Sequence, residues 1–135
     1  MPATAHALLS RYHQALNERD TRACLALVSE DVLLDLNQGA REVGRAAFAA
    51  FIERTQRCYR ESIEDPVILG EPSGRRAACE FTLNGEYLAT DEGLPDAFGQ
   101  RYRLAAGAFF EIRQGRIARI SHYFNLPDWL ARVDA

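Results

Sequence analysis

His122 is the side chain of this sequence best suited to acid–base chemistry. It lies in the segment from Arg116 to Asn125, whose alternation of apolar and polar residues is typical of a β-strand. With a period of two, one face of that strand carries Ala118, Ile120, His122 and Phe124. An imidazole with an ordinary pKa of about 6.5 would then lie among apolar neighbours. The pattern predicts either a general base or a buried structural histidine bonded to the backbone or to water.

Tyr12 and Asp35 are the two side chains predicted to work with His122. Tyr12 lies on the apolar stripe of a helix-like segment, and its hydroxyl is suited to donating a hydrogen bond to a carbonyl oxygen. Asp35 lies in a short strand-like run, and its carboxylate would orient the imidazole or act as the base itself. Each has a structural alternative. Tyr12 would be a core residue with a satisfied hydroxyl, and strand parity would turn Asp35 to the other face unless a bulge intervenes.

The predicted catalytic set is therefore Tyr12, Asp35 and His122. The predicted ligand-binding set is Leu36, Asn37, Phe51, Phe81, Ala108, Phe110, Phe124 and Trp129. The sequence has no glycine-rich phosphate loop, no nucleophile elbow and no helical pair of histidines, so neither a metal site nor a cofactor is predicted. The expected partner is a small, largely hydrophobic molecule with a polar or carbonyl group.

The composition is that of an ordinary soluble globule. A length of 135 residues with 47% hydrophobic and 26% charged content predicts a single domain over residues 1–135. The net charge of -3 comes without any basic cluster, which argues against nucleic acids and membrane surfaces. The cysteines Cys24, Cys58 and Cys79 form no C-x-x-C pair and are expected to be reduced packing residues. With no apolar run of membrane-spanning length and no basic signal-peptide start, a cytoplasmic location is expected.

The order of elements predicts an α+β fold. A first helix carries Tyr12, and Asp20 is expected to cap a short second helix with Cys24, Leu27 and Val28. The histidines His6 and His13 are expected on the exposed or opposite sides of the first helix. The later elements are a strand at Val32 to Asn37, a helix opened by Gly44, strands at Ser62 to Leu69, Arg76 to Tyr87, Gln100 to Arg113 and Arg116 to Asn125, and a helix at Pro127 to Val133.

The segment from Gln100 to Arg113 has apolar residues on both strand faces. One face would pack on the helices. The other face, with Ala105, Gly107 and Phe109, would also have to be shielded from water by another part of the protein or by a second chain. A homodimer built on that outer face is therefore expected. The acidic loop from Thr90 to Asp96 is expected to be a solvated connection, with a flap at a pocket mouth as the functional alternative.

Several motifs make the chain resemble a known superfamily. The order of elements, Arg11-Tyr-His-Gln-Ala-Leu-Asn17 and Gly115-Arg-Ile117 resemble NTF2-like proteins. Asp35 to Gly39, Tyr87 to Pro95, Gly107 to Arg113 and Tyr123 to Trp129 are similar to the ketosteroid isomerase-related, SnoaL-like proteins. The resemblance covers about residues 7–131. It implies a cone-shaped α+β barrel, open at one end, whose curved antiparallel or mixed sheet wraps around the N-terminal helices and encloses an apolar pocket.

The resemblance to ketosteroid isomerases gives a test for each residue. In those enzymes an aspartate moves a proton while a tyrosine and a neutral acid stabilise the enolate oxygen. Tyr12 matches the tyrosine, but the base position falls on Leu36, between Asp35 and Asn37, and the second acid position falls on Ala108. The resemblance therefore implies an isomerase or cyclase type of cofactor-free proton transfer rather than steroid isomerisation by the family's own mechanism.

Two alternatives stay open at this point. The first is a ligand-binding or dimerisation module without turnover. The second is a hydrolase that activates water on the same scaffold, which would require an Asp–Arg pair in the pocket. The candidate arginines for such a pair are Arg41, Arg45 and Arg103.

Overall fold

The computed structural model describes residues 4–36 and 39–134. The helices are α1 (Ala5–Asn17), α2 (Thr21–Ala26), α3 (Arg45–Cys58) and α4 (Leu126–Val133). The strands are β1 (Val28–Asp35), β2 (Glu42–Val43), β3 (Tyr59–Gly70), β4 (Arg76–Tyr87), β5 (Gln100–Arg113) and β6 (Arg116–Phe124).

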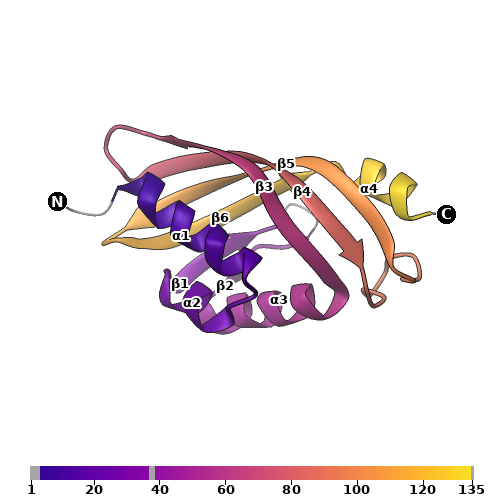
Figure 1. Cartoon of the computed structure of the whole chain (residues 1–135). Helices are drawn as coiled ribbons and strands as arrows, with labels where there is room; N and C mark the ends of the chain where they lie inside the picture. The colour runs from indigo at the N-terminus through magenta and orange to yellow at the C-terminus, as the bar shows by residue number, and fades with distance from the viewer. Residues whose placement is uncertain (1–3, 37–38, 135) are drawn as a thin grey trace.

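The strands form one curved mixed sheet in the order β2-β1-β6-β5-β4-β3. Strand β1 runs parallel to β6, and the other neighbours are antiparallel. The sheet does not close, because β2 and β3 are its two edges. Helices α1, α2 and α3 gather on one side of the sheet, while α4 lies at its far end, near the C-terminus (Figure 1). This arrangement confirms the expected α+β cone.

Local signals in the sequence set several element boundaries. Asp20 caps α2 as predicted, since its Oδ1 accepts a hydrogen bond from the Ala23 amide over 3.0 Å. Asn125 caps α4 in the same way, through the Asp128 amide at 3.1 Å. The β5–β6 hairpin turns at Gln114 and Gly115, which both have positive φ, and this tight turn fixes the register that places His122.

The structure corrects two predicted boundaries. Val28 begins β1 instead of ending the second helix, because it pairs in parallel with Ile117 of β6. Strand β3 begins at Tyr59 rather than Ser62 and continues through a bulge that contains Asp65 in a left-handed conformation. The second correction brings Glu61 into the sheet.

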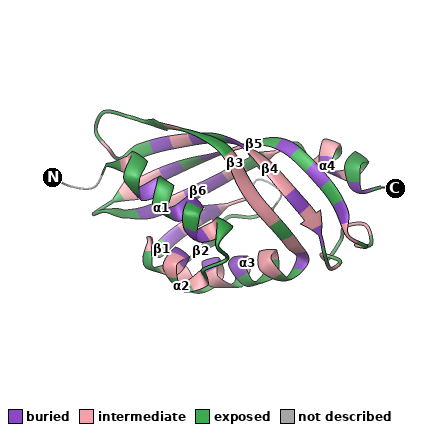
Figure 2. Cartoon of the chain, in the orientation of Figure 1, coloured by how far each residue is buried: buried purple, intermediate pink, exposed green. Residues whose placement is uncertain are grey.

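The apolar core has two parts, and Figure 2 shows buried segments along the strands and on the inner sides of the helices. The larger cluster lies between the sheet and helices α1 to α3 and includes Tyr12, Phe48 and Phe110. The smaller cluster joins α4 to β4 and β5 and contains Tyr87, Tyr102, Leu104, Trp129 and Val133. The three cysteines are buried and not disulfide-bonded, as predicted. Within the described ranges, no helix has the length and apolar character needed to span a membrane.

Candidate functional site

His122 lies on the helix-facing side of β6. It pairs across the sheet with Ala108, and Ile120 and Phe124 share its strand face, as the alternation predicted. Its ring meets that of Phe51 from α3 edge-on, with a centroid distance of 6.0 Å. His122 is half-buried rather than sealed in the core. The imidazole therefore contacts an aromatic side chain of α3 while part of its surface stays accessible.

His13 is the second histidine of this region, and its predicted surface position is wrong. It is only 5% exposed. Its ring lies 5.9 Å from that of Phe81 and 6.2 Å from that of Phe110, and its Nδ1 is 4.0 Å from the Sγ of Cys79. Two adjacent positions of α1 are buried because Tyr12 turns toward α3 while His13 turns toward β4. A single apolar stripe does not describe a helix that is covered on two sides.

The environment keeps both imidazoles neutral. Burial lowers the pKa of His13 to about 4. Burial, followed by the electrostatic effect of His13, lowers the pKa of His122 to about 4. On the sheet, Ala108 lies between Cys79 and His122 and contributes only a methyl group there. Near neutral pH both rings are therefore neutral, each with one nitrogen that donates and one that accepts a hydrogen bond.

Tyr12 is fully buried beside His13. Its ring packs 6.4 Å from Phe48 and 6.0 Å from Phe110. Among the described residues its hydroxyl has no hydrogen-bond partner. Burial, followed by the nearby Cys24 thiol, raises the pKa of Tyr12 well above its ordinary value. The phenol therefore lies in the core among α2, α3 and β5, and the expected convergence of Tyr12 with His122 stays a prediction.

Asp35 lies on the opposite face of the sheet from His122. It is paired with Ser121, whose Oγ donates to Asp35 Oδ2 over 3.0 Å. Arg41 donates to both carboxylate oxygens, over 2.7 and 2.9 Å, and this bond lowers the pKa of Asp35. The bulge of β1 lies between Val28 and Leu33, before Asp35, so it does not turn the carboxylate inward. The structure therefore does not bring Asp35 to His122.

The hydrolase alternative requires an Asp–Arg pair on the inner face. None of the three candidate arginines, Arg41, Arg45 and Arg103, forms such a pair there. Arg41 forms its pair with Asp35 on the outer face. Arg45 donates to the carbonyl of Val28 over 2.8 Å, and Arg103 pairs with Glu64. None of these contacts provides a carboxylate and a guanidinium beside His122.

Most of the predicted ligand-binding residues are brought together. The group on the inner side of the sheet and helices comprises Leu36, Phe51, Phe81, Ala108, Phe110 and Phe124. Asn37 lies outside the described residues. Trp129 belongs instead to the smaller cluster, where its ring packs 5.1 Å from Tyr87 and 5.9 Å from Tyr102. Trp129 is therefore a core residue of that cluster, at the α4 end of the sheet.

Glu61 is an inner-face acid that the sequence analysis did not include. The Tyr102 hydroxyl donates a hydrogen bond to its Oε2 over 2.5 Å. Burial raises the pKa of Glu61, against the opposite effect of the Tyr102 hydrogen bond. Gly85 makes room for this contact, because a Cβ at that position would lie 2.3 Å from the Tyr102 ring. Alternation of Tyr59, Glu61 and Ile63 was the available signal, but the predicted strand began at Ser62, three residues after the observed start.

The acidic loop is tied to the aromatic cluster. The Tyr87 hydroxyl donates to the carbonyl of Pro95 over 2.6 Å. The Tyr59 hydroxyl donates to Asp91 Oδ2 over 2.8 Å, and Gln100 Nε2 donates to the Asp96 carbonyl over 2.9 Å. These anchors favour the fixed connection over the moving flap.

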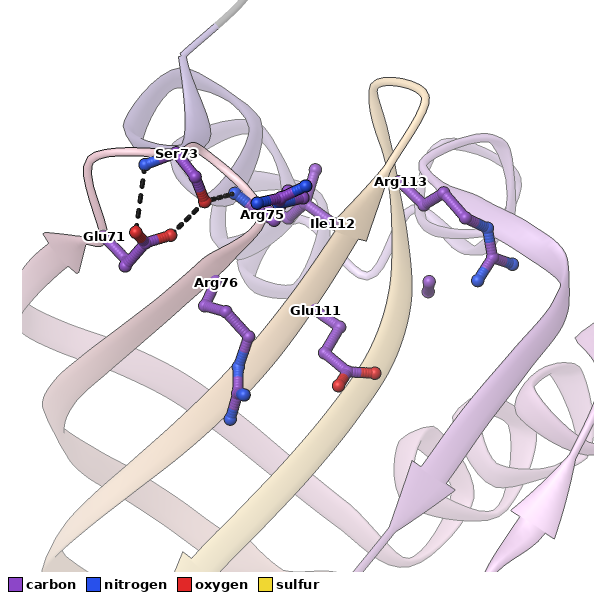
Figure 3. A pocket seen from close by; sticks show the side chains of 8 residues that line it. Glu71, Ser73, Arg75, Arg76, Glu111, Ile112 and Arg113 are labelled. Atoms are coloured by element: carbon purple, nitrogen blue, oxygen red, sulfur yellow. Dashed lines mark hydrogen bonds between the residues drawn. The ribbon is translucent and has the colours of Figure 1, made fainter.

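A surface hollow of about 390 Å³ lies between the β3–β4 turn and the β5–β6 hairpin (Figure 3). Its lining residues are Glu71, Ser73, Arg75, Arg76, Glu111, Ile112, Arg113 and Ala118. Arg113 is paired with Asp31 over 2.8 Å, and Glu111 lies 3.4 Å from Arg119. The hollow contains none of the predicted site residues, and its lining carries charges of both signs.

Comparisons with known proteins agree with this fold. Residues 9–120 match the SnoaL-like domain. The crystal structure of a protein from Pseudomonas putida KT2440, proposed to be a polyketide cyclase, superimposes with a TM-score of 0.96. The two sequences are 54% identical, and the match covers 97% of this chain and 98% of that chain. A protein from Xanthomonas campestris pv. campestris with the same proposed activity is 49% identical, with a TM-score of 0.92 over 96% of each chain.

More distant structures show the fold alone. An epoxide hydrolase of M. tuberculosis described as LEH-like is 19% identical, with a TM-score of 0.76 over 96% of this chain and 88% of that chain. The comparison with curated proteins gives no match. On the family model and the two close structures, the chain belongs to the SnoaL-like domain family.

Proposed function

We propose that this protein is a cofactor-free enzyme of the cyclase or isomerase type, acting on a largely apolar small molecule with a carbonyl group. The observation that carries the proposal is the position of His122, half-buried on the apolar helix-facing side of β6 with its ring edge-on to that of Phe51. The polyketide cyclase activity proposed for relatives that are 49% and 54% identical supports the same class of reaction.

The ligand would lie on the inner face beside His122. Leu36 and Phe124 on that face, and Phe51 of α3 beside His122, are only half-buried, in contrast to fully buried Phe110. Inward-facing apolar surface that the protein's own packing leaves accessible is what a hydrophobic ligand would cover. The surface hollow between the β3–β4 turn and the β5–β6 hairpin is lined by charged side chains instead and suits such a ligand poorly.

In the proposed reaction, a nitrogen of His122 takes a proton from the carbon next to the carbonyl. The C–H bonding electrons move to form the enolate, whose negative charge lies on the carbonyl oxygen. In this proposal His13 donates its N–H to that oxygen, with the Tyr12 hydroxyl as the alternative donor. The enolate carbon then attacks a second carbonyl of the same molecule, or the proton returns at another carbon. In either case His122 gives back the proton it took, so no co-reactant is consumed.

The pKa of about 4 for His122 has a defined consequence for this chemistry. The ring is neutral, and so able to accept a proton, throughout the range above about pH 5. Because a base of low pKa is weak, the donor to the enolate oxygen must supply much of the transition-state stabilisation. The rate should be constant at neutral pH and fall about tenfold per pH unit once the pH drops below the pKa of His122.

The exchange of α-protons in a simple apolar ketone tests this proposal without knowledge of the natural substrate. We expect the wild-type protein to accelerate deuterium incorporation at C1 and C3 of 2-tetralone in D2O, followed by NMR. His122→Gln should lose at least about 100-fold of the acceleration, in the range expected for a general base. His6→Gln, the same substitution at an exposed histidine of α1, is the matched control. An unchanged rate in His122→Gln would contradict the proposal.

A ligand-binding module without turnover is the second candidate, because the low pKa of His122 suits hydrogen bonding better than proton abstraction. Under this alternative, 2-tetralone would raise the melting temperature of the wild-type protein but not of His122→Gln, and it would show no accelerated exchange.

We also propose that the outer sheet face pairs with a second copy of the chain. Phe109 and Tyr123 pack edge to face there at 5.5 Å and remain 49% and 48% exposed. Leu69, 63% exposed, lies on the nearby end of β3. Sedimentation of wild type and Phe109→Asp tests this: a dimer that the substitution dissociates is expected. Phe98→Asp, at a 67% exposed residue in the loop before β5, is the control, and a monomeric wild type would contradict the proposal.

A further inference from the structure

Asn17, the last residue of α1, bonds to the backbone of β3 through both ends of its side-chain amide. Its Nδ2 donates to the carbonyl of Ile63 over 3.1 Å, and its Oδ1 accepts from the Ile63 amide over 2.8 Å. Strand β3 is an edge of the sheet, so its outer side has no strand neighbour among the described residues. Because a side-chain amide carries the same donor and acceptor as a peptide group, Asn17 takes the place of a neighbouring strand there.

These two bonds tie α1 to the sheet in a directional way. The apolar contacts beneath the helix hold it on the core but are non-directional, whereas hydrogen bonds require a defined distance and angle. The side-chain bonds of Ser10 with His6 and of Gln14 with Glu18 stay on the helix and its cap. The pairing of Asn17 with Ile63 is therefore suited to setting the rotation of α1 and its position along β3.

The turn that follows α1 is held at the same end. Arg19 has a left-handed backbone conformation, with a φ of 57°. Its guanidinium donates to the carbonyl of Tyr59 over 3.1 Å and also to the carbonyl of Gln56. The turn is thus bound to the junction of α3 and β3, and the C-terminal end of α1 is its anchored end.

His13 lies one helical turn before Asn17, on the same side of α1, because residues four positions apart are neighbours on a helix surface. Ile63 pairs with Leu83 of β4, and Phe81 is the next residue of that strand with the same orientation. The ring of His13 lies 5.9 Å from that of Phe81. The bonds of Asn17 and the ring of His13 therefore meet the sheet at adjacent places.

We propose that Asn17 is a positioning residue, whose two bonds to Ile63 hold α1 at the rotation that presents His13 to the inner face. The inference rests on the proposed function for the role of His13 as the donor to the enolate oxygen. Asn17 itself is exposed and acts only through the helix. Since a donor must be aligned with the charge that develops in the transition state, a small displacement of α1 reduces turnover more than binding.

The exchange of 2-tetralone in Asn17→Ala tests this proposal. Turnover should fall about 10- to 100-fold, the cost of a misplacement of about 1 Å, while KM stays within about twofold of wild type. Gln14→Ala is the matched control, because it removes another exposed amide of α1, one that donates to Glu18 over 3.1 Å, and it should keep both wild-type values. Asn17→Ser, whose hydroxyl is too short to reach both backbone groups, repeats the test should Asn17→Ala fold poorly.

NMR titration of His13 shows whether α1 has moved. The pKa of about 4 that burial gives this ring should rise toward its ordinary value of about 6.5 in Asn17→Ala, because a displaced helix lets water reach the imidazole. A lower overall stability without a displacement of α1 would leave this pKa unchanged. Faster hydrogen exchange of the Ile63 amide should accompany the change, since that amide loses its acceptor.

The positioning role and the proposed reaction fail in different ways. If 2-tetralone shows no exchange that depends on His122, but the pKa of His13 depends on Asn17, the placement of His13 stands and the proposed reaction falls. If exchange depends on His122 and Asn17→Ala turns over at the wild-type rate, the reaction stands and the positioning role is overturned. A wild-type pKa of His13 in both Asn17→Ala and Asn17→Ser would also overturn it.

Discussion

Replacing His13 by glutamine should make the stability of the protein less dependent on pH. His13 has a folded pKa of about 4 because it is buried, against about 6.5 in an unfolded chain. Between these values the unfolded state binds a proton that the folded state does not, so the free energy of unfolding falls as the pH falls. For a single such group, the loss between pH 7 and pH 5 is about 2 kcal/mol. Glutamine cannot titrate, so His13→Gln should lose this contribution.

The assay is urea unfolding followed by the fluorescence of Trp129, which is only 4% exposed in the folded state. We expect the free energy of unfolding of wild type to decrease more steeply from pH 7 to pH 5 than that of His13→Gln, whatever their difference at pH 7. His6→Gln removes an exposed histidine and should follow the wild-type curve. Parallel curves for wild type and His13→Gln would refute the conclusion that His13 is held neutral by burial.

Three further predictions follow from the contacts of individual residues. Gly85→Ala should reduce the free energy of unfolding by about 1–3 kcal/mol, measured by urea unfolding, because the new Cβ collides with the Tyr102 ring. A stability equal to wild type would contradict the close approach. Tyr12→Phe should change the melting temperature little, because its hydroxyl has no partner among the described residues; a large loss would reveal a hidden bond. Asp35→Asn weakens the contact with Arg41 and should cost less than about 1 kcal/mol, with 2-tetralone exchange at the wild-type rate. A loss of exchange would restore Asp35 to the site.

The strand pattern was strong enough to predict much of the architecture. Alternation located β4 and β5 with the bounds observed, and the Gln114–Gly115 turn located the last hairpin. The same alternation correctly placed His122 on the inner face. For Asp35, the alternation of strand residues predicted the outer face of the sheet, and the structure confirms this. The catalytic role predicted for Asp35 would have required the inner face.

The missed features depend on packing between distant segments. His13 is buried because α1 is enclosed on one side by β4 and on the other by α3, which a single helical stripe does not encode. Glu61 was missed because the predicted strand began at Ser62, whereas pairing with β4 extends β3 back to Tyr59. A hydrogen bond such as Tyr102 to Glu61, across three strands, becomes visible only once the register is known.

Intermolecular NOEs from a bound probe test the central claim most directly, because the claim is that the ligand lies on the inner face beside His122. With saturating 2-tetralone, we predict NOEs from the probe protons to the imidazole protons of His122 and to the ring of Phe124. NOEs confined to Phe109 and Tyr123, on the outer face, would contradict the claim and place the binding surface on the other side of the sheet.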